Sequence, residues 1–109
     1  MRLSPTLRAH SARLTLFTRA DCSLCDTAKS NLAQVQKRKP VEYTEVNVMA
    51  AGQELWKNNY EFDVPVLHVQ RVTYTYSKPD ILSEARKLMH RFSVEEVEKL
   101  VEEAEAGIS

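Results

Sequence analysis

The chain has 109 residues, of which 43% are hydrophobic and 28% charged, so its length and composition are those of one globular domain. Its only two glycines, Gly52 and Gly107, lie far apart, which excludes the glycine-rich phosphate-binding loops of nucleotide-binding proteins. The formal net charge is zero and no apolar run reaches the roughly 18 residues of a membrane span, so we expect neither nucleic acid nor membrane as a partner.

The N-terminal segment is basic. Arg2 and Arg8 precede the first acid, Asp21, and serine and threonine lie between them. A mitochondrial targeting segment has this composition, but we favour a flexible basic tail over residues 1–12, with the domain at 13–109. No apolar core of a secretory signal is present. We therefore expect a reducing compartment, the cytoplasm or alternatively the mitochondrion.

The first half of the domain alternates between strand and helix. Residues 13–19 and 41–48 have the β-branched, alternating pattern of strands. Between them, residues 23–37 carry a helical apolar stripe formed by Leu24, Ala28, Leu32 and Val35. Residues 50–60 predict a short helix.

The second half is predicted to hold a hairpin and a final helix. Residues 64–70 form the most apolar strand, and residues 72–76 predict a second strand after a turn near Arg71. Tyr74 and Tyr76 would share one face of that second strand. Residues 79–91 are expected to form a partly helical connection.

The last helix has the clearest end signals. Ser93 and Glu96 form a capping box, and Phe92 with Val97 fits a hydrophobic staple. Gly107 is placed to end the helix. The predicted order is βαβαββα, which gives an α/β fold with a four-stranded mixed sheet and helices on both faces.

Charge is uneven along the chain. Residues 1–40 carry eight Lys/Arg and two acids, whereas residues 41–109 carry seven Lys/Arg and thirteen acids. A basic face for an anionic partner is one interpretation. We favour the other, that these surface charges pair with one another in the fold.

Cys22 and Cys25 form the motif that indicates chemistry. They follow a strand and open a helix, the context in which Cys-x-x-Cys indicates redox function. The sulfur of Cys22 would lie near the free amide groups of the helix N-terminus, which favours thiolate over thiol, and Cys25 should be more buried. Asp21 and Asp26 oppose thiolate formation, while Arg19 favours it. Asp21 is also a candidate N-cap.

Two other interpretations of the cysteines remain. They could be incidental core residues, or they could bind zinc with His10, His68 or His90 as further ligands. The histidine spacing fits no compact zinc finger, and we expect no metal. His68 is expected to be a hydrogen-bonded core residue, and Trp56, Tyr60 and Phe62 are expected to pack in the core rather than to line a substrate groove.

Pro65 opens a buried strand between two valines, where it cannot donate to the sheet. A cis Val64–Pro65 bond would place this loop beside the cysteines. The Val64 backbone would then be free to bind an extended chain.

Together, the strand at 14–18, the motif Cys22-Ser23-Leu24-Cys25 and the sequence Val64-Pro65-Val66 resemble the thioredoxin fold in its short glutaredoxin-like form, over roughly residues 13–106. The resemblance implies a nucleophilic Cys22, a resolving Cys25 and a cis Pro65. It also implies that Arg19, Val64 and Pro65 contact substrate or glutathione.

Two departures from the family matter. Ser23-Leu24 replaces the usual Pro-Tyr or Pro-Phe between the cysteines, and the Gly-Gly pair that follows the cis-proline hairpin in glutathione-binding members is absent. The second departure predicts weak glutathione binding.

We therefore expect a monomeric thiol–disulfide oxidoreductase that acts on protein or low-molecular-weight disulfides. It needs no bound cofactor, and glutathione is a candidate reductant. The alternatives are a catalytically weak interaction module and a metal or iron–sulfur carrier that uses Cys22.

Overall fold

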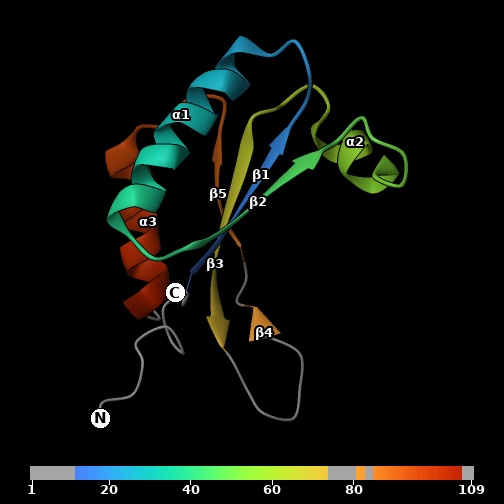
Figure 1. Ribbon diagram of the computed structural model, residues 1–109. Helices are drawn as coiled ribbons and strands as arrows, with labels where there is room; N and C mark the ends of the chain where they lie inside the picture. The colour runs from blue at the N-terminus through green and yellow to red at the C-terminus, as the bar shows by residue number, and fades with distance from the viewer. Residues whose placement is uncertain (1–11, 74–80, 83–84, 107–109) are drawn as a thin grey trace.

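The computed structural model describes residues 12–73, 81–82 and 85–106. Its elements are, in order, β1 (Ala12–Thr18), α1 (Ser23–Arg38), β2 (Glu42–Asn47), α2 (Glu54–Tyr60), β3 (Val66–Thr73), β4 (Ile81–Leu82), β5 (Arg86–Met89) and α3 (Val94–Ala106) (Figure 1). None of the helices in these ranges is both long and apolar enough to cross a membrane.

The strands form a mixed sheet in the order β2-β1-β3-β4. β1 and β2 are parallel, as expected for neighbouring strands connected through the helix α1, and β1 and β3 are antiparallel. β4 and β5 both pair antiparallel with β3, β4 along residues 72–73 and β5 along residues 66–69. They therefore act as one interrupted strand, and the predicted four-stranded arrangement is confirmed.

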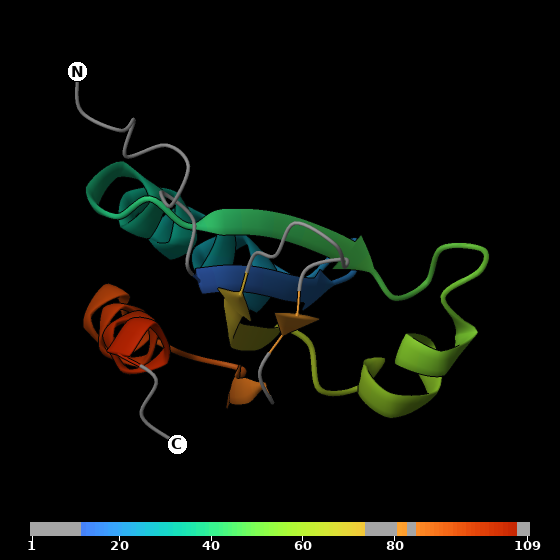
Figure 2. The same cartoon turned by 90° about the horizontal axis from the view of Figure 1, so that it is seen from below.

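Helices cover the two faces of the sheet unequally (Figures 1 and 2). α1 and α3 pack on one face, where their apolar stripes meet the inward residues of β1 and β3 in the larger core cluster. Members of that cluster include Leu14, Leu32, Leu67 and Val97, each fully buried. α2 covers the other face at one end, where Phe17, Val48, Tyr60 and Val66 form a second cluster.

Two predicted elements of the second half were wrong. β3 continues through Arg71, so no hairpin turns there. The chain has no Gly, Asn, Asp or Pro between 66 and 73, and an uninterrupted strand satisfies more backbone hydrogen bonds. Residues 81–82 and 86–89 are strands rather than part of a helical connection, because pairing with β3 overrides helix propensity. Tyr74 and Tyr76 lie outside the described residues.

The helix ends follow the sequence signals where they can be observed. The Ser93 N–H donates to the Glu96 carboxylate at 2.8 Å, and the Glu96 N–H donates to the Ser93 hydroxyl at 3.1 Å, which confirms the capping box. Phe92 and Val97 are buried in the same cluster. α2 begins only at Glu54, because Gly52 turns the chain with a φ of +87°. Gly107 lies outside the described residues.

The uneven charge is balanced by ion pairs between the two halves of the chain. Lys/Arg residues of the first 40 pair with glutamates of the second part in Arg13–Glu42, Lys29–Glu45, Arg38–Glu98 and Lys39–Glu102. The last two pairs join the end of α1 to α3. The pairing interpretation of the charge pattern is therefore confirmed.

His68 lies in an aromatic cluster under α2. Its Nε2 is 2.9 Å from the Tyr60 hydroxyl, and its ring packs edge-on against Phe17, Trp56 and Tyr60. The predicted core role of His68 is confirmed. Burial lowers the pKa of His68, and the facing Lys87 lowers it further.

We expect His68 to make the protein less stable in mild acid. An unfolded histidine has a pKa near ~6.5. The unfolded state therefore takes up the proton first as the pH falls, and stability is lost from about that pH down through the lower folded pKa. Urea unfolding near pH ~7.5 and ~5.5 tests this. His68→Gln, which can still bond Tyr60, should lose less stability over that interval than the wild type; an equal loss in both would contradict the assignment.

Candidate functional site

Cys22 and Cys25 are joined by a disulfide at the start of α1, with their Cα atoms 5.2 Å apart. Cys22 is the N-cap of the helix, and its sulfur accepts the Cys25 N–H at 3.1 Å. Asp21 is therefore not the N-cap. It lies one residue earlier with a φ of 58°, which turns the chain from β1 into the helix.

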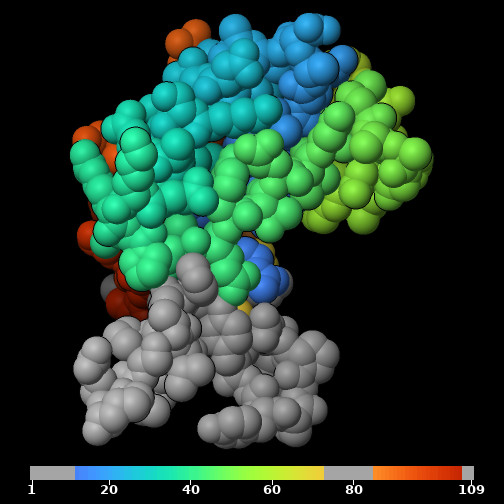
Figure 3. Space-filling model, in the orientation of Figure 1, coloured from blue at the N-terminus to red at the C-terminus, as the bar shows by residue number. Residues whose placement is uncertain are grey.

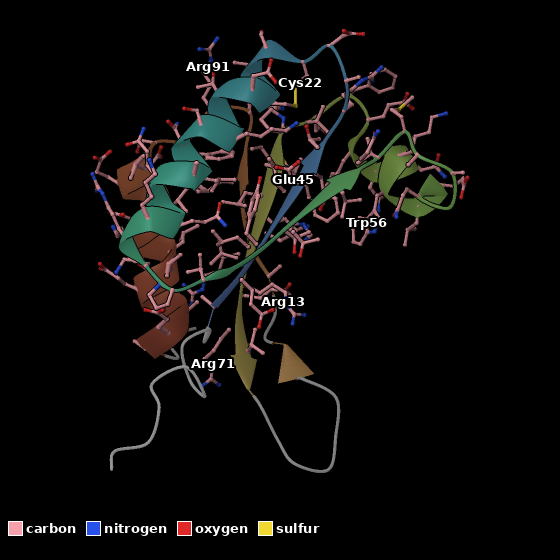
Figure 4. All side chains as sticks on the ribbon, in the orientation of Figure 1. Arg13, Cys22, Glu45, Trp56, Arg71 and Arg91 are labelled. Atoms are coloured by element: carbon pink, nitrogen blue, oxygen red, sulfur yellow. A yellow bond between two sulfur atoms is a disulfide. The ribbon has the colours of Figure 1, made fainter. Side chains whose placement is uncertain are left out.

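The two cysteines differ in accessibility. Cys25 is completely buried beneath the first turn of α1, whereas Cys22 is partly exposed. Figure 4 shows Cys22 at the end of the molecule where α1 begins. The greater burial of Cys25 is as predicted.

Arg19 joins the cysteine loop to the loop before β3. One Nη1–H of its guanidinium donates to the Glu61 carbonyl at 3.1 Å. Arg19 was expected to be available for a substrate carboxylate. It lies beside the cysteine loop, and this backbone contact occupies one of its five N–H groups.

The Val64–Pro65 peptide bond is cis, as the resemblance implied. The Pro65 carbonyl accepts the His90 N–H at 2.8 Å, which ties this loop to the end of β5. The Val64 N–H donates to the Tyr60 carbonyl at 3.1 Å. The expectation that the Val64 backbone is free was therefore wrong for its N–H. Among the described residues, no backbone N–H reaches the Val64 carbonyl.

Sheet register brings these segments to one end of the molecule. Val66, next to Pro65, pairs with Phe17 near the end of β1 and with Met89 at the end of β5. The predicted residues Arg19, Cys22 and Pro65 therefore belong to loops at the same end of the sheet.

Two residues that had not been assigned to this end, Asp63 and His90, lie there, and the predicted position of Phe62 was wrong. His90 Nε2 lies 3.6 Å from the Asp63 carboxylate, and Phe62 is 88% exposed rather than packed in the core. Trp56 and Tyr60 do pack in the second cluster, as predicted. The signal for Phe62 was its position between two acids, Glu61 and Asp63, where a core residue is uncommon.

An open pocket of about 330 Å³ lies between the start of α1 and the segment after β5, lined by residues that include Leu24, Thr27, His90 and Arg91. Figure 4 shows Arg91 at the same end of the molecule as Cys22. Within the described ranges, no three His, Cys, Asp or Glu residues are grouped closely enough to hold a metal ion.

Residues 13–102 match the family model described as Glutaredoxin-like domain (DUF836). The chain belongs to this glutaredoxin-like family. The match covers both cysteines, the cis-proline loop and most of α3, so the fold and the site belong to one and the same domain. The family resemblance predicted from the cysteine and proline motifs is therefore confirmed.

Solved structures agree on the fold of this glutaredoxin-like protein. A structural-genomics target protein from X. campestris is 26% identical, with a TM-score of 0.58 over 84% of this chain and 97% of that one. A malarial protein is 13% identical, with a TM-score of 0.61 over 87% and 98%. Chloroplastic thioredoxin z is 16% identical, with a TM-score of 0.62 over 94% and 86%. The last two comparisons establish the thioredoxin fold alone.

Proposed function

We propose that this protein is a thiol–disulfide oxidoreductase with Cys22 as nucleophile and Cys25 as resolving thiol. The observation that carries the proposal is the unequal burial of a bonded cysteine pair at a helix N-terminus. The N-terminal amides and the helix dipole favour a thiolate at Cys22. The Cys22 sulfur already accepts one of those amides in the oxidised protein.

The reaction proceeds through two exchanges. The Cys22 thiolate attacks one sulfur of a substrate disulfide, the substrate S–S bond breaks, and its other sulfur leaves as a thiolate that takes a proton from water. Cys25, deprotonated, then attacks Cys22 and releases the second substrate thiol. The substrate gains two electrons, and the protein keeps the Cys22–Cys25 disulfide, which an external thiol such as glutathione or a reductase must reduce.

We propose that glutathione binds weakly. Arg19, which is partly exposed, can offer a carboxylate one charge pair, and a single pair near the surface contributes only about 0–1 kcal/mol. The Val64 N–H is already used by Tyr60, so one of the two backbone hydrogen bonds expected for a cysteinyl segment is lost. These contacts must also offset the entropy of ordering a flexible tripeptide.

The order of the two cysteines can be tested by alkylation. In the reduced protein, Cys22 is expected to react with iodoacetamide at least about tenfold faster than the buried Cys25. Peptide mapping by mass spectrometry at short reaction times measures both rates. Equal rates, or faster modification of Cys25, would contradict the assignment; urea-unfolded protein, in which the two should react alike, is the control.

A further inference from the structure

We propose that the site takes a protein disulfide in an extended segment whose cysteine has apolar and basic neighbours, with Phe62 as the apolar contact and Asp63 and Asp21 as the charge partners. This inference rests on the proposed function and adds the substrate class. Three independent observations support it: the exposure of Phe62, its place beside the cysteine loop, and the charge around it.

Phe62 is a large apolar side chain without packing. Its exposed fraction of 88% is the highest among the exposed large hydrophobic residues of the described chain, and its neighbours Tyr60 and Val64 belong to the second cluster. Met89 is 40% exposed and pairs with Val66, the residue that follows Pro65. Exposed apolar side chains near one loop are typical of a contact surface.

Phe62 also lies beside the redox loop. The Arg19–Glu61 hydrogen bond holds the residue just before Phe62 against the segment that leads to Cys22. In Figure 3 the blue surface of the loop between β1 and α1 meets the green to yellow-green surface of α2 and its flanking segments at the same end of the molecule. The Val64 carbonyl, which accepts no backbone N–H from the described residues, can pair with an extended substrate chain that runs between Phe62 and Cys22.

The charges around Phe62 and Cys22 are mostly negative. Asp21 and Asp26 are exposed on either side of the cysteines. The Asp63 side chain is 48% exposed and lies 3.6 Å from Nε2 of the half-exposed His90. Arg19 is a positive charge next to these acids, since it contacts the Glu61 carbonyl. Arg91 lines the pocket beside the start of α1. A basic side chain beside the substrate cysteine is therefore attracted, and an acidic one is repelled.

The test follows Cys22 alone, in Cys25→Ser protein. The probes are mixed disulfides of 5-thio-2-nitrobenzoate with three thiols: a five-residue peptide with central cysteine, leucine on both sides and lysine at both ends; the same peptide with glutamate at both ends; and 2-mercaptoethanol. The Cys22 thiolate attacks the sulfur of the peptide or of mercaptoethanol. A mixed disulfide with Cys22 replaces the probe disulfide, and the coloured 5-thio-2-nitrobenzoate thiolate is released. Phe62→Ala is compared with Leu55→Ala, a second exposed apolar residue, on α2.

We expect the lysine peptide to react about tenfold faster than the mercaptoethanol probe, and Phe62→Ala to lose most of that advantage. Leu55→Ala should retain it. The glutamate peptide should react about threefold more slowly than the lysine peptide, with the difference shrinking in about 1 M salt.

The outcomes separate this inference from the proposed function. Equal effects of Phe62→Ala and Leu55→Ala would overturn the apolar contact, and equal rates for the two peptides would overturn the charge preference. If Cys22 reacts with the mercaptoethanol probe no faster than free cysteine does, the proposed function is contradicted, and this inference with it.

Discussion

Replacing Cys22 with serine is expected to abolish disulfide reduction, and replacing Cys25 is expected to stop the reaction at a mixed disulfide. A serine hydroxyl is too weak an acid to act in place of the accessible thiolate, so Cys22→Ser should fall to the uncatalysed rate. Cys25→Ser keeps the attack but loses the neighbouring thiol. A positioned intramolecular thiol is far more effective than a free one. Release of the substrate thiol from the mixed disulfide on Cys22 should therefore slow by about a hundredfold or more.

The measurement is reduction of a disulfide substrate together with mass spectrometry of the trapped protein. Ser23→Ala, which changes an exposed residue between the cysteines and keeps both thiols, is the matched control and should retain activity. Turnover by Cys22→Ser would contradict the assignment of the nucleophile. Turnover of glutathione mixed disulfides by Cys25→Ser, at the rate of a glutaredoxin measured alongside, would contradict weak glutathione binding.

The largest effect on stability is expected from Leu14→Ala. Leu14 is fully buried in the centre of β1, between β2 and β3, in the larger core cluster. Truncating such a side chain costs about 2–5 kcal/mol, through lost burial and the cavity left behind. That is a large share of the roughly 5–15 kcal/mol by which a domain is stable.

Urea unfolding of the wild type and of two leucine variants measures this cost. Leu55→Ala is the matched control, because Leu55 is 67% exposed on α2 and its loss should change the free energy of unfolding by less than about 0.5 kcal/mol. A cost below about 1 kcal/mol for Leu14→Ala would contradict the position of β1 at the centre of the core.

The sequence predicted the parts of the fold that depend on local patterns. The apolar stripe of α1 lies within a single helix and the Ser93–Glu96 capping box within one helical turn, and both are present, with Ala28, Leu32 and Val35 buried. The predicted position of the hairpin was wrong because it depends on pairing between residues that are distant in the sequence. Arg86–Met89 has no strong strand propensity and is a strand only because β3 offers it an edge.

The candidate site also has a part that could be predicted from the sequence and a part that could not. Cys22, Cys25 and Pro65 were predicted because their chemistry depends on residue type and short spacing. Neither the Arg19–Glu61 contact nor the use of the Val64 N–H by Tyr60 could be predicted, since both depend on the path of the loop after α2. The exposure of Phe62 depends on the same path, and an apolar residue is by default assigned to the core.

The most direct test of the central claim is mass spectrometry of the reduced wild-type protein at intervals after oxidised glutathione is added. Oxidation by two electrons without added mass from glutathione, mapped to a Cys22–Cys25 disulfide, is the predicted result, with any glutathione adduct on Cys22 only transient. A persistent glutathione adduct, or two cysteines that stay reduced while free cysteine is oxidised, would contradict a dithiol mechanism at this site.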